Sequence, residues 1–462
     1  MRLTTALRLQ AQQAKEVVAL VGAGGKTALM FRLADELAAA GRRVVTTMTT
    51  KIFVSQMARA PVAVVWQDEN ALSATSNVIR HTSYEDALLA RVAEMLARYK
   101  HVLVIGGASA EQDKVQGLAP QLVDRLAGHE AVDAVIVEAD GSRRRPFKAP
   151  AAHEPVIPAT ATLVVPVVGM GVVGKPLTAD HVHRPEIVAA LAGVPVGDPV
   201  TPEVIATILA HPQAGAKGVP VGARLVPFLN KVEDEAALQT ARRVARLLLA
   251  HPHVESVIIG AAEAADPVVD VWGRVAAVVL AAGQGKRFGA LKQILPWHGV
   301  PLAAHVADQA LACADVERVF VTVGAGADEV RRALAGRNVT CVPVPDWAEG
   351  QSRSVQAGLR AAETASAVLF LLADQPGVSA GLLSALIQRH RETLAPIVAP
   401  RYRGQRGNPV LFDRAVFGEF AGLAGDIGAR PIIQAHQHEV AWVDWPAPDI
   451  LKDIDTAEDY RP

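Results

Sequence analysis

Residues 280–289 form a glycine-rich segment, LAAGQGKRFG, which follows an apolar run and precedes Lys292. Glycines let backbone N–H groups approach a triphosphate closely, and Arg287 and Lys292 can neutralise the charge that grows on the β- and γ-phosphates as pyrophosphate leaves. This chemistry is nucleotidyl transfer. An ordinary strand-to-helix turn with surface cations explains the same residues, because glycine loops alone are weak signals.

Acidic residues follow apolar runs in the same half of the chain. Residues 370–376, FLLADQP, are typical of a buried strand that ends in Asp374 and a proline. Open α/β sheets bind ligands at the ends of such strands, where a carboxylate can hold Mg²⁺ against phosphate oxygens. The segment DIDT at residues 453–456 is typical of a capped helix start.

A second glycine-rich segment, LVGAGGKT, covers residues 20–27. Its end is similar to a Walker A motif, but leucine stands at position 20, where that motif requires glycine. The tighter pattern GxxGKT, which includes Gly22 and Gly25, resembles the short phosphate loop of the Mur ligases. N–H groups at a helix start hold a phosphate in such a loop, while Lys26 supplies charge and Thr27 can reach Mg²⁺. A bare helix N-terminus is the alternative.

Two carboxylates and a basic run follow the apolar residues 134–137. Glu138 and Asp140 can bind the metal ion of this second loop, or they can simply end a strand. Residues 143–145 are three consecutive arginines. A basic run is usually a solvated face, but beside carboxylates at a strand end it also suits a phosphate-rich ligand.

Length and composition limit the class of protein. The chain has 462 residues, enough for two or three domains, and its net charge of -1 comes from 46 Lys and Arg against 47 Asp and Glu. Nucleic acid and membrane surfaces are therefore poor candidates for the main partner. Two cysteines, without CxxC spacing, do not predict a disulfide framework. Since no apolar run reaches about 18 residues, we expect a soluble cytoplasmic protein.

The elements that must position these residues alternate between strands and helices. The order of apolar run, glycine turn and helical pattern occurs twice, which predicts two tandem α/β nucleotide-binding domains, the first P-loop-like and the second Rossmann-like. Small residues and Pro267 at residues 261–273 place the boundary near Trp272, and we expect domains at residues 1–271 and 272–462. Right-handed parallel crossovers are expected in both.

Residues 274–462 resemble the MobA-like nucleotidyltransferases, most closely the molybdenum cofactor cytidylyltransferase branch. The family's LxAGxSxRMGxxK loop stands here as LAAGQGKRFGALK, its acidic turn as LADQP, its GNPVLF and GDxGAR loops as GNPVLF and GDIGAR, and its terminal DIDTPED as DIDTAED. The departures are mild, with Gln284 and Gly285 in the variable loop and Phe288 where Met is usual.

This resemblance implies a site for CTP, Mg²⁺ and molybdopterin. Gly283, Arg287 and Lys292 would hold the triphosphate, and Asp374 would bind Mg²⁺ with Asp453 or Asp455 as a second acid. The positions implied to contact nucleotide are Ala281, Ala282, Gly283, Gly285, Gly289 and Asn408. Within the family LAAG accompanies cytidylyl transfer and LAGG accompanies guanylyl transfer, so Ala282 implies CTP. Residues 345–354 match a loop expected at the acceptor side, although Ser352 can equally cap a helix.

Residues 1 to about 270 resemble the YqeC family, accessory proteins of selenium-dependent molybdenum hydroxylases. The segments that carry the likeness are VGAGGKT, VEADGSRRRPFKAPAAHEPVIP, LNKVED and DKVQGL. The resemblance implies a second nucleotide, ATP or GTP, and a role in maturing a molybdenum hydroxylase, but it leaves the reaction open. LNKVED is also similar to the NKxD base-reading turn of GTPases, yet Glu233 stands at the acid position, so the motif alone does not predict guanine.

Both halves therefore indicate the same process, cofactor maturation for a molybdenum hydroxylase. We expect CTP:molybdopterin cytidylyl transfer with release of pyrophosphate, carried out beside a nucleotide-binding accessory domain. Two alternatives remain open. One is a carrier that delivers molybdenum cofactor to the apo-hydroxylase without turnover, and the other is an NAD(P)H-dependent reductase on the same fold. Neither nucleic acid nor membrane is expected as a partner.

Overall fold

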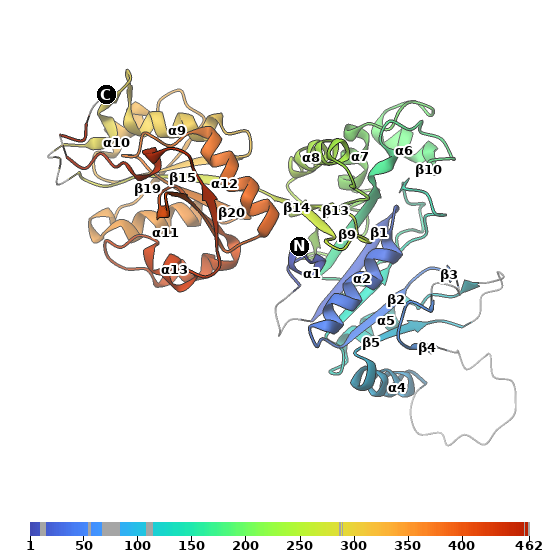
Figure 1. Cartoon of the computed structure of the whole chain (residues 1–462). Coiled ribbons are helices and arrows are strands. Elements are labelled where there is room, and N and C mark those ends of the chain that lie inside the picture. The colour runs from blue at the N-terminus through green and yellow to red at the C-terminus, as the bar shows by residue number, and fades with distance from the viewer. Residues whose placement is uncertain are drawn as a thin grey trace, which may run out of the picture. The chain divides into compact units, whose positions relative to one another are not determined.

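The computed structural model describes residues 1–9, 15–53, 57–66, 84–107, 114–285, 288, 290–456 and 458–460. The chain divides into two compact units, Met1–Trp272 and Gly273–Pro462, and each contains a sheet with helices packed on it (Figure 1). Both units are α/β. Arg287 and Gly289, two residues expected to contact the triphosphate, lie outside the described residues.

Ten described strands form the main sheet of the N-terminal unit. Along the sheet they follow the order β14 (Val268–Gly273), β13 (Ser256–Gly260), β12 (Phe228–Asn230), β9 (Leu163–Gly169), β1 (Glu16–Gly22), β7 (Ala134–Glu138), β2 (Val44–Met48), β5 (His101–Ile105) and β4 (Ala63–Val65), with β11 (Arg224–Leu225) beside β9. The neighbours from β13 to β4 all run parallel, as expected for this half. The sequence pattern of residues 224–229 predicts one strand, but the structure divides it into β11 and β12, because Pro227 has no N–H to donate.

Strand β1 lies at the centre of this sheet. Its Val18 is in register with Leu163 of β9 and Ile136 of β7. Apolar side chains of these strands are buried on both faces, as a parallel sheet covered by helices requires. Since parallel strands end at one edge of the sheet, the residues that follow β1, β7, β9 and β12 gather at that edge.

Helices and short strands complete the N-terminal unit. The helices are α1 (Leu3–Ala6), α2 (Lys26–Ala39), α4 (Tyr84–Tyr99), α5 (Pro120–Gly128), α6 (Pro185–Ala192), α7 (Pro202–Ala210) and α8 (Glu235–Leu249), with a 3-10 turn at Met170–Val172. Two short pairs join β3 (Ile52–Phe53) with β6 (Lys114–Val115) and β8 (Phe147–Lys148) with β10 (Val182–His183). Helix α2 begins directly after the glycine loop and buries Leu29, Leu33 and Leu37 on one face.

The sheet of the C-terminal unit is mixed. Its order is β19 (Thr340–Pro343), β18 (Arg318–Val323), β15 (Val275–Ala281), β20 (Ala367–Leu372), β23 (Val410–Asp413), β21 (Ile397–Tyr402) and β22 (Gln405–Arg406), with β24 (Val440–Asp444) beside β21. Strand β23 runs antiparallel to both β20 and β21, so the expectation of parallel crossovers throughout this half is wrong. The GNPVLF segment, expected as a polar loop, supplies this strand.

Helices cover both faces of the second sheet. They are α9 (Leu302–Ala312), α10 (Ala327–Ala333), α11 (Gln351–Ala361), α12 (Ala380–Thr393) and α13 (Arg430–Ala435), joined by 3-10 turns at Lys292–Ile294, Trp347–Glu349, Arg414–Gly422 and Pro448–Leu451 and by the hairpin of β16 (Pro296–Trp297) and β17 (Val300–Pro301).

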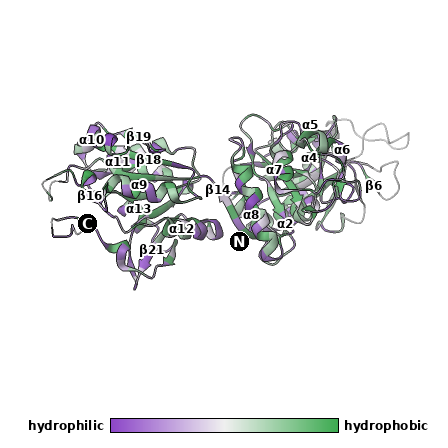
Figure 2. Cartoon of the chain, turned by 90° about the horizontal axis from the view of Figure 1, so that it is seen from above, coloured by the Kyte–Doolittle hydropathy of each residue, from purple (hydrophilic) through white to green (hydrophobic). Residues whose placement is uncertain are grey.

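Successive residues of β15 belong to different cores. Val279 packs in one core with Leu371 and Leu386, and Val278 packs in the other with Val355 and Phe412. This alternation follows from the two-residue period of a strand. Hydrophobic colouring is strong along the strands inside each unit (Figure 2). In the described part of the chain, no helix has both the length and the apolar character that crossing a bilayer requires.

Candidate functional site

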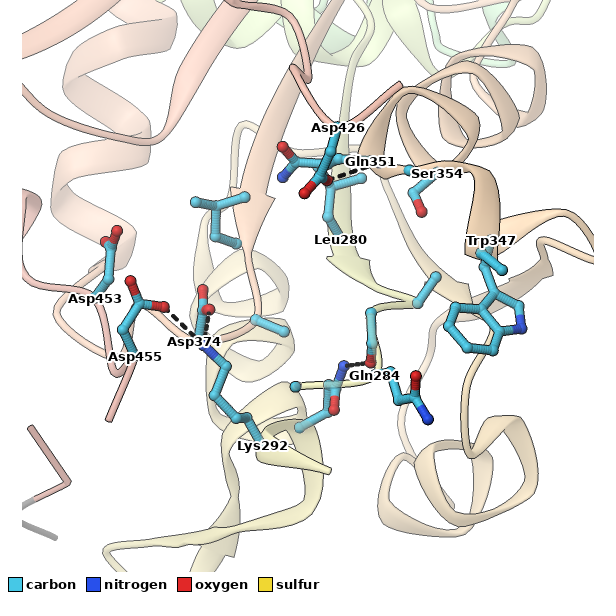
Figure 3. A pocket seen from close by; sticks show the side chains of 18 of the residues that line it. Leu280, Gln284, Lys292, Trp347, Gln351, Ser354, Asp374, Asp426, Asp453 and Asp455 are labelled. Carbon is cyan, nitrogen blue, oxygen red and sulfur yellow. Dashed lines mark hydrogen bonds and ion pairs between the residues drawn. The ribbon is translucent and has the colours of Figure 1, made fainter. Parts of the chain in front are cut away.

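A pocket of about 700 Å³ opens at the carboxyl ends of β15 and β20. It is lined by the glycine loop after β15, the acidic turn after β20, the segment before α11 and the C-terminal acidic residues (Figure 3). Among the residues expected at the site, those that line it are Ala282, Gly283, Gly285, Lys292, Asp374, Asp453 and Asp455. Ala281 is the last residue of β15. Asn408 is not among the lining residues, and its N–H donates to the carbonyl of Ile450 over 3.1 Å.

The glycine loop packs against the segment that follows it in the chain. Gly285 has φ +63°, and a Cβ there would lie 2.4 Å from the carbonyl oxygen of Ala290, so only glycine fits. Gly283 differs, because a Cβ would find nothing nearer than Gln293 at 3.9 Å. The Gln293 amide donates to the carbonyl of Gly283. Packing therefore requires glycine at position 285. At Gly283 no packed atom requires it, and the space beside this residue is open to the pocket.

Ala282 faces two environments. Its methyl group packs in a small cluster with Val344 and Ala357, and the residue also lines the pocket. Its carbonyl accepts a hydrogen bond from Ala325 N over 3.0 Å. The backbone of Ala282 is thus held by a hydrogen bond from Ala325, which lies just after β18.

Lys292 bridges two carboxylates at one side of the pocket. Its Nζ lies 2.8 Å from Asp374 Oδ2 and 3.0 Å from Asp455 Oδ1, and it also donates to the carbonyl of Ile454 over 2.7 Å (Figure 3). Burial alone would lower the pKa of Lys292, but the hydrogen bonds and charges of the two carboxylates outweigh burial and raise it. The sequence predicts that Lys292 contacts the triphosphate, whereas in the structure it contacts Asp374 and Asp455.

The C-terminal acids lie beside the turn after β20. Ile454 N donates to the carbonyl of Asp374 over 3.0 Å, which joins the two segments. Asp453 accepts a hydrogen bond from the Gln375 amide. Burial raises the pKa of Asp453, and the nearby charges of Asp374 and Asp455 raise it further, against the effect of Gln375. Thr456 N and Thr456 Oγ1 both donate to Asp459 Oδ2 over 2.8 Å, as at the start of a helix, but residues 458–459 form a turn and not a helix.

The opposite side of the pocket is formed by the start of α11 and the GDIGAR loop. Gln351 N donates to Asp426 Oδ1 over 3.2 Å, and Ser352 N donates to the carbonyl of Gly425 over 3.2 Å. Gly350, not Ser352, is the N-cap residue of α11. Ser352 is fully buried in the first turn, and the capping alternative is therefore wrong. Trp347 adds the one indole ring among the lining residues (Figure 3).

Gln293 was missed by sequence reasoning, although it lines the pocket. Trp347 and Asp426 also line the pocket, and they belong to the 345–354 segment and to the GDIGAR loop, which the sequence did single out. Gln293 directly follows Lys292, and its position next to a predicted phosphate ligand is the signal that was available. Arg353, expected near the acceptor, instead pairs with Glu349 and with Asp346, the latter at 3.2 Å, and does not line the pocket.

The glycine loop of the N-terminal unit holds its own lysine. Lys26 is 3% exposed, and its Nζ donates to the carbonyl of Gly22 over 2.7 Å. The same ammonium lies 3.2 Å from Asp140 Oδ1 and 3.6 Å from Glu138 Oε1. Burial acts to lower the pKa of Lys26, but the two carboxylates raise it overall. The structure thus brings Lys26, Glu138 and Asp140 together.

Thr27 and the loop backbone extend this group. Thr27 Oγ1 donates to Glu138 Oε2 over 2.7 Å, and Gly22 N donates to Asp140 Oδ2 over 3.1 Å. The loop is also tightly packed, because a Cβ on Gly25 would lie 2.2 Å from the Asn230 amide nitrogen. Glu138, the last residue of β7, and Asp140, two residues later, therefore contact the loop directly, whereas the sequence left open that they merely end a strand.

A buried ion network continues from Asp140. Lys148 Nζ lies 2.9 Å from Asp140 Oδ2 and 2.8 Å from Glu154 Oε2, and Arg184 lies 2.7 Å from the same Glu154 oxygen. Burial acts to raise the pKa of Glu154, but the hydrogen bonds from Arg184 and Lys148 lower it to about 2. Arg143 and Arg144 are exposed, and the buried cation of this basic segment is Lys148.

The carboxylates of both units are candidate ligands for a metal ion. Among the residues that the structure describes, no three His, Cys, Asp or Glu side chains already converge as a metal site. In each unit, however, a lysine ammonium is shared by two carboxylates, at Lys292 and at Lys26. Carboxylate oxygens are the ligands that Mg²⁺ prefers, so the donors at both places fit this ion.

Known proteins match each unit separately. Residues 18–186 match the family model of the YqeC protein, and residues 277–440 match that of the MobA-like NTP transferase domain. The YqeC protein of Escherichia coli strain K12 is 35% identical over 223 residues, covering 48% of this chain and 78% of that protein. Nicotine blue oxidoreductase of Paenarthrobacter nicotinovorans is 32% identical over 196 residues, covering 40% of this chain and 95% of that protein.

A solved structure is also similar to part of the chain. The crystal structure of a homologue of Mycobacterium tuberculosis Rv0371c, from Mycobacterium sp. strain JC1, is 34% identical and covers 40% of this chain and 93% of that chain, with a TM-score of 0.37. The C-terminal unit is a Rossmann-like α/β domain of the nucleotidyltransferase class. The chain belongs to two families. Its N-terminal half belongs to the YqeC family, and its C-terminal half belongs to the MobA-like NTP transferase family.

Proposed function

We propose that the C-terminal unit transfers a cytidylyl group from CTP to molybdopterin and releases pyrophosphate. The observation that carries the proposal is one pocket that is lined by the open glycine loop together with Lys292, Asp374 and Asp455. Such a pocket can hold a triphosphate next to paired acids and one cation. The choice of CTP and molybdopterin rests on the likeness of this half to the cytidylyltransferase branch, with Ala282 in the LAAG loop.

Asp374 and Asp455 are the residues that would hold Mg²⁺, with Asp453 as a further acid. A bound Mg²⁺ would polarise the phosphate oxygens and offset their charge. The structure supports these ligands because Lys292 already places a positive charge 2.8 and 3.0 Å from the two carboxylates. Gln375 holds Asp453 by its amide and orients that carboxyl group.

The remaining residues of the pocket bind and orient the substrates. The N–H groups of Gly283 and Gly285 are proposed to contact the phosphates, and Gln293 keeps this loop in place through the carbonyl of Gly283. Lys292 and Arg287 neutralise the departing pyrophosphate. No protein nucleophile is needed, because catalysis of this reaction depends on positioning and on charge neutralisation.

For the N-terminal unit we propose Mg²⁺-dependent binding of a second nucleotide, ATP or GTP, at a P-loop-like site. Gly22, Gly25, Lys26 and Thr27 would contact its phosphates. Glu138 and Asp140 would hold Mg²⁺ together with the Thr27 hydroxyl, which now donates to Glu138 over 2.7 Å. This unit is proposed to assist the maturation of a molybdenum hydroxylase, with the apo-hydroxylase as partner.

A reductase is the second candidate for the C-terminal unit. The relative named nicotine blue oxidoreductase is matched over 95% of its length at 32% identity, which favours redox chemistry on this fold. The two candidates consume different co-substrates, since a transferase uses CTP and a reductase uses NAD(P)H.

The test supplies the full chain with molybdenum cofactor, Mg²⁺ and either CTP, GTP or NADPH. Pyrophosphate release with CTP, well above that with GTP, is expected. Asp374→Asn is the matched control, since it keeps the size of the side chain but removes its charge. NADPH oxidation without pyrophosphate release from CTP would contradict the transferase proposal and support the reductase.

A further inference from the structure

Lys148, the last residue of β8, is buried close to the glycine loop of the N-terminal unit, and all of its donors are engaged. The residue is 3% exposed. Its ammonium lies 2.9 Å from Asp140 Oδ2, and it donates to Glu154 Oε2 over 2.8 Å and to the carbonyl of Gly141 over 2.7 Å. A lysine ammonium has three N–H groups, so none remains for a ligand. Lys148 can therefore act on the site only through the groups that it holds.

The two carboxylate oxygens of Asp140 have different surroundings. The residue is 1% exposed. Its Oδ2 accepts from Gly22 N over 3.1 Å and is also the oxygen beside Lys148. Its Oδ1 accepts no hydrogen bond within the part of the chain that the structure describes, although Lys26 Nζ lies 3.2 Å away. One oxygen of this acid is thus anchored, while the other is buried and lacks a donor.

The oxygen that lacks a donor lies among the residues of the proposed nucleotide site. Lys26 Nζ lies 3.2 Å from Asp140 Oδ1 and 3.6 Å from Glu138 Oε1, and the Thr27 hydroxyl donates to the other oxygen of Glu138. A buried acceptor without a partner costs free energy, and it commonly marks a place for a bound ion or water. Oδ1 is therefore the atom of Asp140 that suits a cation.

The space beside Lys148 is too small for a substrate. The cavity lined by Gly22, Asp140 and Lys148 has a volume of about 10 Å³. Such a volume holds about one water molecule. The other walls of the cavity are apolar and include Pro150 and Ile208. The ions buried here do not form a second substrate site, so their task has to be sought at Asp140.

Lys148 is itself held by a longer chain of buried ions. Arg184 donates to Glu154 Oε2 over 2.7 Å and to the carbonyl of Ala149 over 3.2 Å. Apolar residues of similar volume would often stabilise a fold as well as buried ion pairs do, so stability alone does not explain this network. The network balances three cations against three acids, which are Lys26, Lys148 and Arg184 with Glu138, Asp140 and Glu154.

We propose that Lys148 is a positioning residue for Mg²⁺ in the N-terminal unit, because it anchors Oδ2 of Asp140 and leaves Oδ1 free to bind the metal ion. The inference rests on the phosphate and Mg²⁺ site proposed above. Residues that hydrogen-bond to the ligands of a metal ion fix the orientation of those ligands. Without Lys148 the Asp140 carboxylate can rotate, and both of its oxygens become available to Lys26.

The test compares the full chain with Lys148→Met, which keeps the length of the side chain but removes its charge and its donors. Binding of ATP and of GTP is measured over a Mg²⁺ titration, and the binding that Lys26→Ala removes is assigned to the N-terminal site. We expect Lys148→Met to raise the Mg²⁺ concentration at half-maximal effect about 10- to 100-fold and to leave metal-free nucleotide binding nearly unchanged. If the lysine acted by its charge alone, removing it would instead tighten Mg²⁺ binding.

Two further variants separate positioning from stability. Arg242→Met is the matched control, since Arg242 of α8 pairs over 2.7 Å with the fully buried Asp270 of β14. It is expected to lower stability, measured by urea unfolding, without moving the Mg²⁺ titration. The double change of Lys148→Met with Glu154→Gln removes one cation and one acid, so the buried charges stay balanced. It is expected to fold and to shift the Mg²⁺ titration as Lys148→Met does.

The outcomes distinguish the positioning role from the nucleotide site itself. A folded Lys148→Met protein, or the double variant, with the wild-type Mg²⁺ titration or with tighter Mg²⁺ binding would overturn the role of Lys148 and leave the nucleotide site intact. If Lys26→Ala removes no nucleotide binding, the phosphate site itself is absent, and the role of Lys148 falls with it.

Discussion

The ammonium of Lys292 lies 2.8 Å from the Asp374 carboxylate and occupies the side of the pocket where that acid faces Asp455. In the proposed reaction Asp374 and Asp455 would hold Mg²⁺, and the Lys292 ammonium would then be available to the phosphates. Lys292→Ala is therefore expected to lower the rate of pyrophosphate release on the order of 10²- to 10³-fold, as loss of a transition-state charge contact does. A stopped assay with saturating CTP measures this rate, and a loss below about threefold would contradict the role.

Asp374→Asn tests the metal proposal separately from binding. The amide keeps the shape of the side chain but presents less charge to a cation, so a higher Mg²⁺ concentration is expected to be needed for half-maximal activity. The titration of activity with Mg²⁺ measures this shift, and CTP affinity in the absence of metal should change little. A carrier without turnover would behave differently, since it would still bind and deliver molybdenum cofactor in the variant.

Lys26→Ala tests whether the two units act independently. Lys26 contacts Asp140, Glu138 and the carbonyl of Gly22, all in the N-terminal unit. We expect nucleotide affinity of that unit to fall by at least about tenfold, because a charge-assisted phosphate contact is lost, while CTP-dependent pyrophosphate release stays near the wild-type rate. Equilibrium binding and the release assay measure the two quantities. Loss of cytidylyl transfer in a folded variant would show that the sites are coupled.

His101 predicts a pH dependence of stability in the N-terminal unit. Burial lowers the pKa of His101 to about 4, and Thr46 Oγ1 lies 2.9 Å from its Nε2. The unfolded chain binds the proton near pH 6.5 and the folded chain only near pH 4, so stability is lost as the pH falls through this interval. The loss is expected to be on the order of 2 to 3 kcal/mol. Urea unfolding at pH 7 and pH 4 measures it, and His101→Gln should remove the part that His101 contributes, while His183, whose pKa burial also lowers to about 4, continues to contribute its own part.

The sequence predicted those parts of the sites that depend on local pattern. Glycine loops after apolar runs, and acids at the ends of later runs, are visible in one dimension because parallel strands end at a common edge. Lys26, Thr27, Glu138 and Asp140 are found together in the structure for this reason. The apolar runs at residues 318–323 and 367–373 also predict strands, and these agree closely with β18 and β20, because an uninterrupted apolar run defines its own limits.

Features that depend on distant partners were missed. Strand β23 has only four residues after Gly-Asn-Pro, a segment typical of a loop, and its antiparallel pairing is set by β20 and β21. Lys148 belongs to a basic stretch typical of a surface, yet it is buried and forms ion pairs with Asp140 and Glu154. Asn230 shows the same limit, because its bridging amide depends on Gly24 and Ala262, far away in the chain.

The mass of the acceptor after reaction is the most direct test of cytidylyl transfer. The full chain is incubated with CTP, Mg²⁺ and molybdenum cofactor, and the pterin product is analysed by mass spectrometry together with the pyrophosphate released. We expect the pterin to gain one cytidine monophosphate unit for each pyrophosphate, and Lys292→Ala to reduce both in parallel. An unchanged pterin mass, with CTP intact and Lys292→Ala indistinguishable from the wild-type chain, would contradict the account.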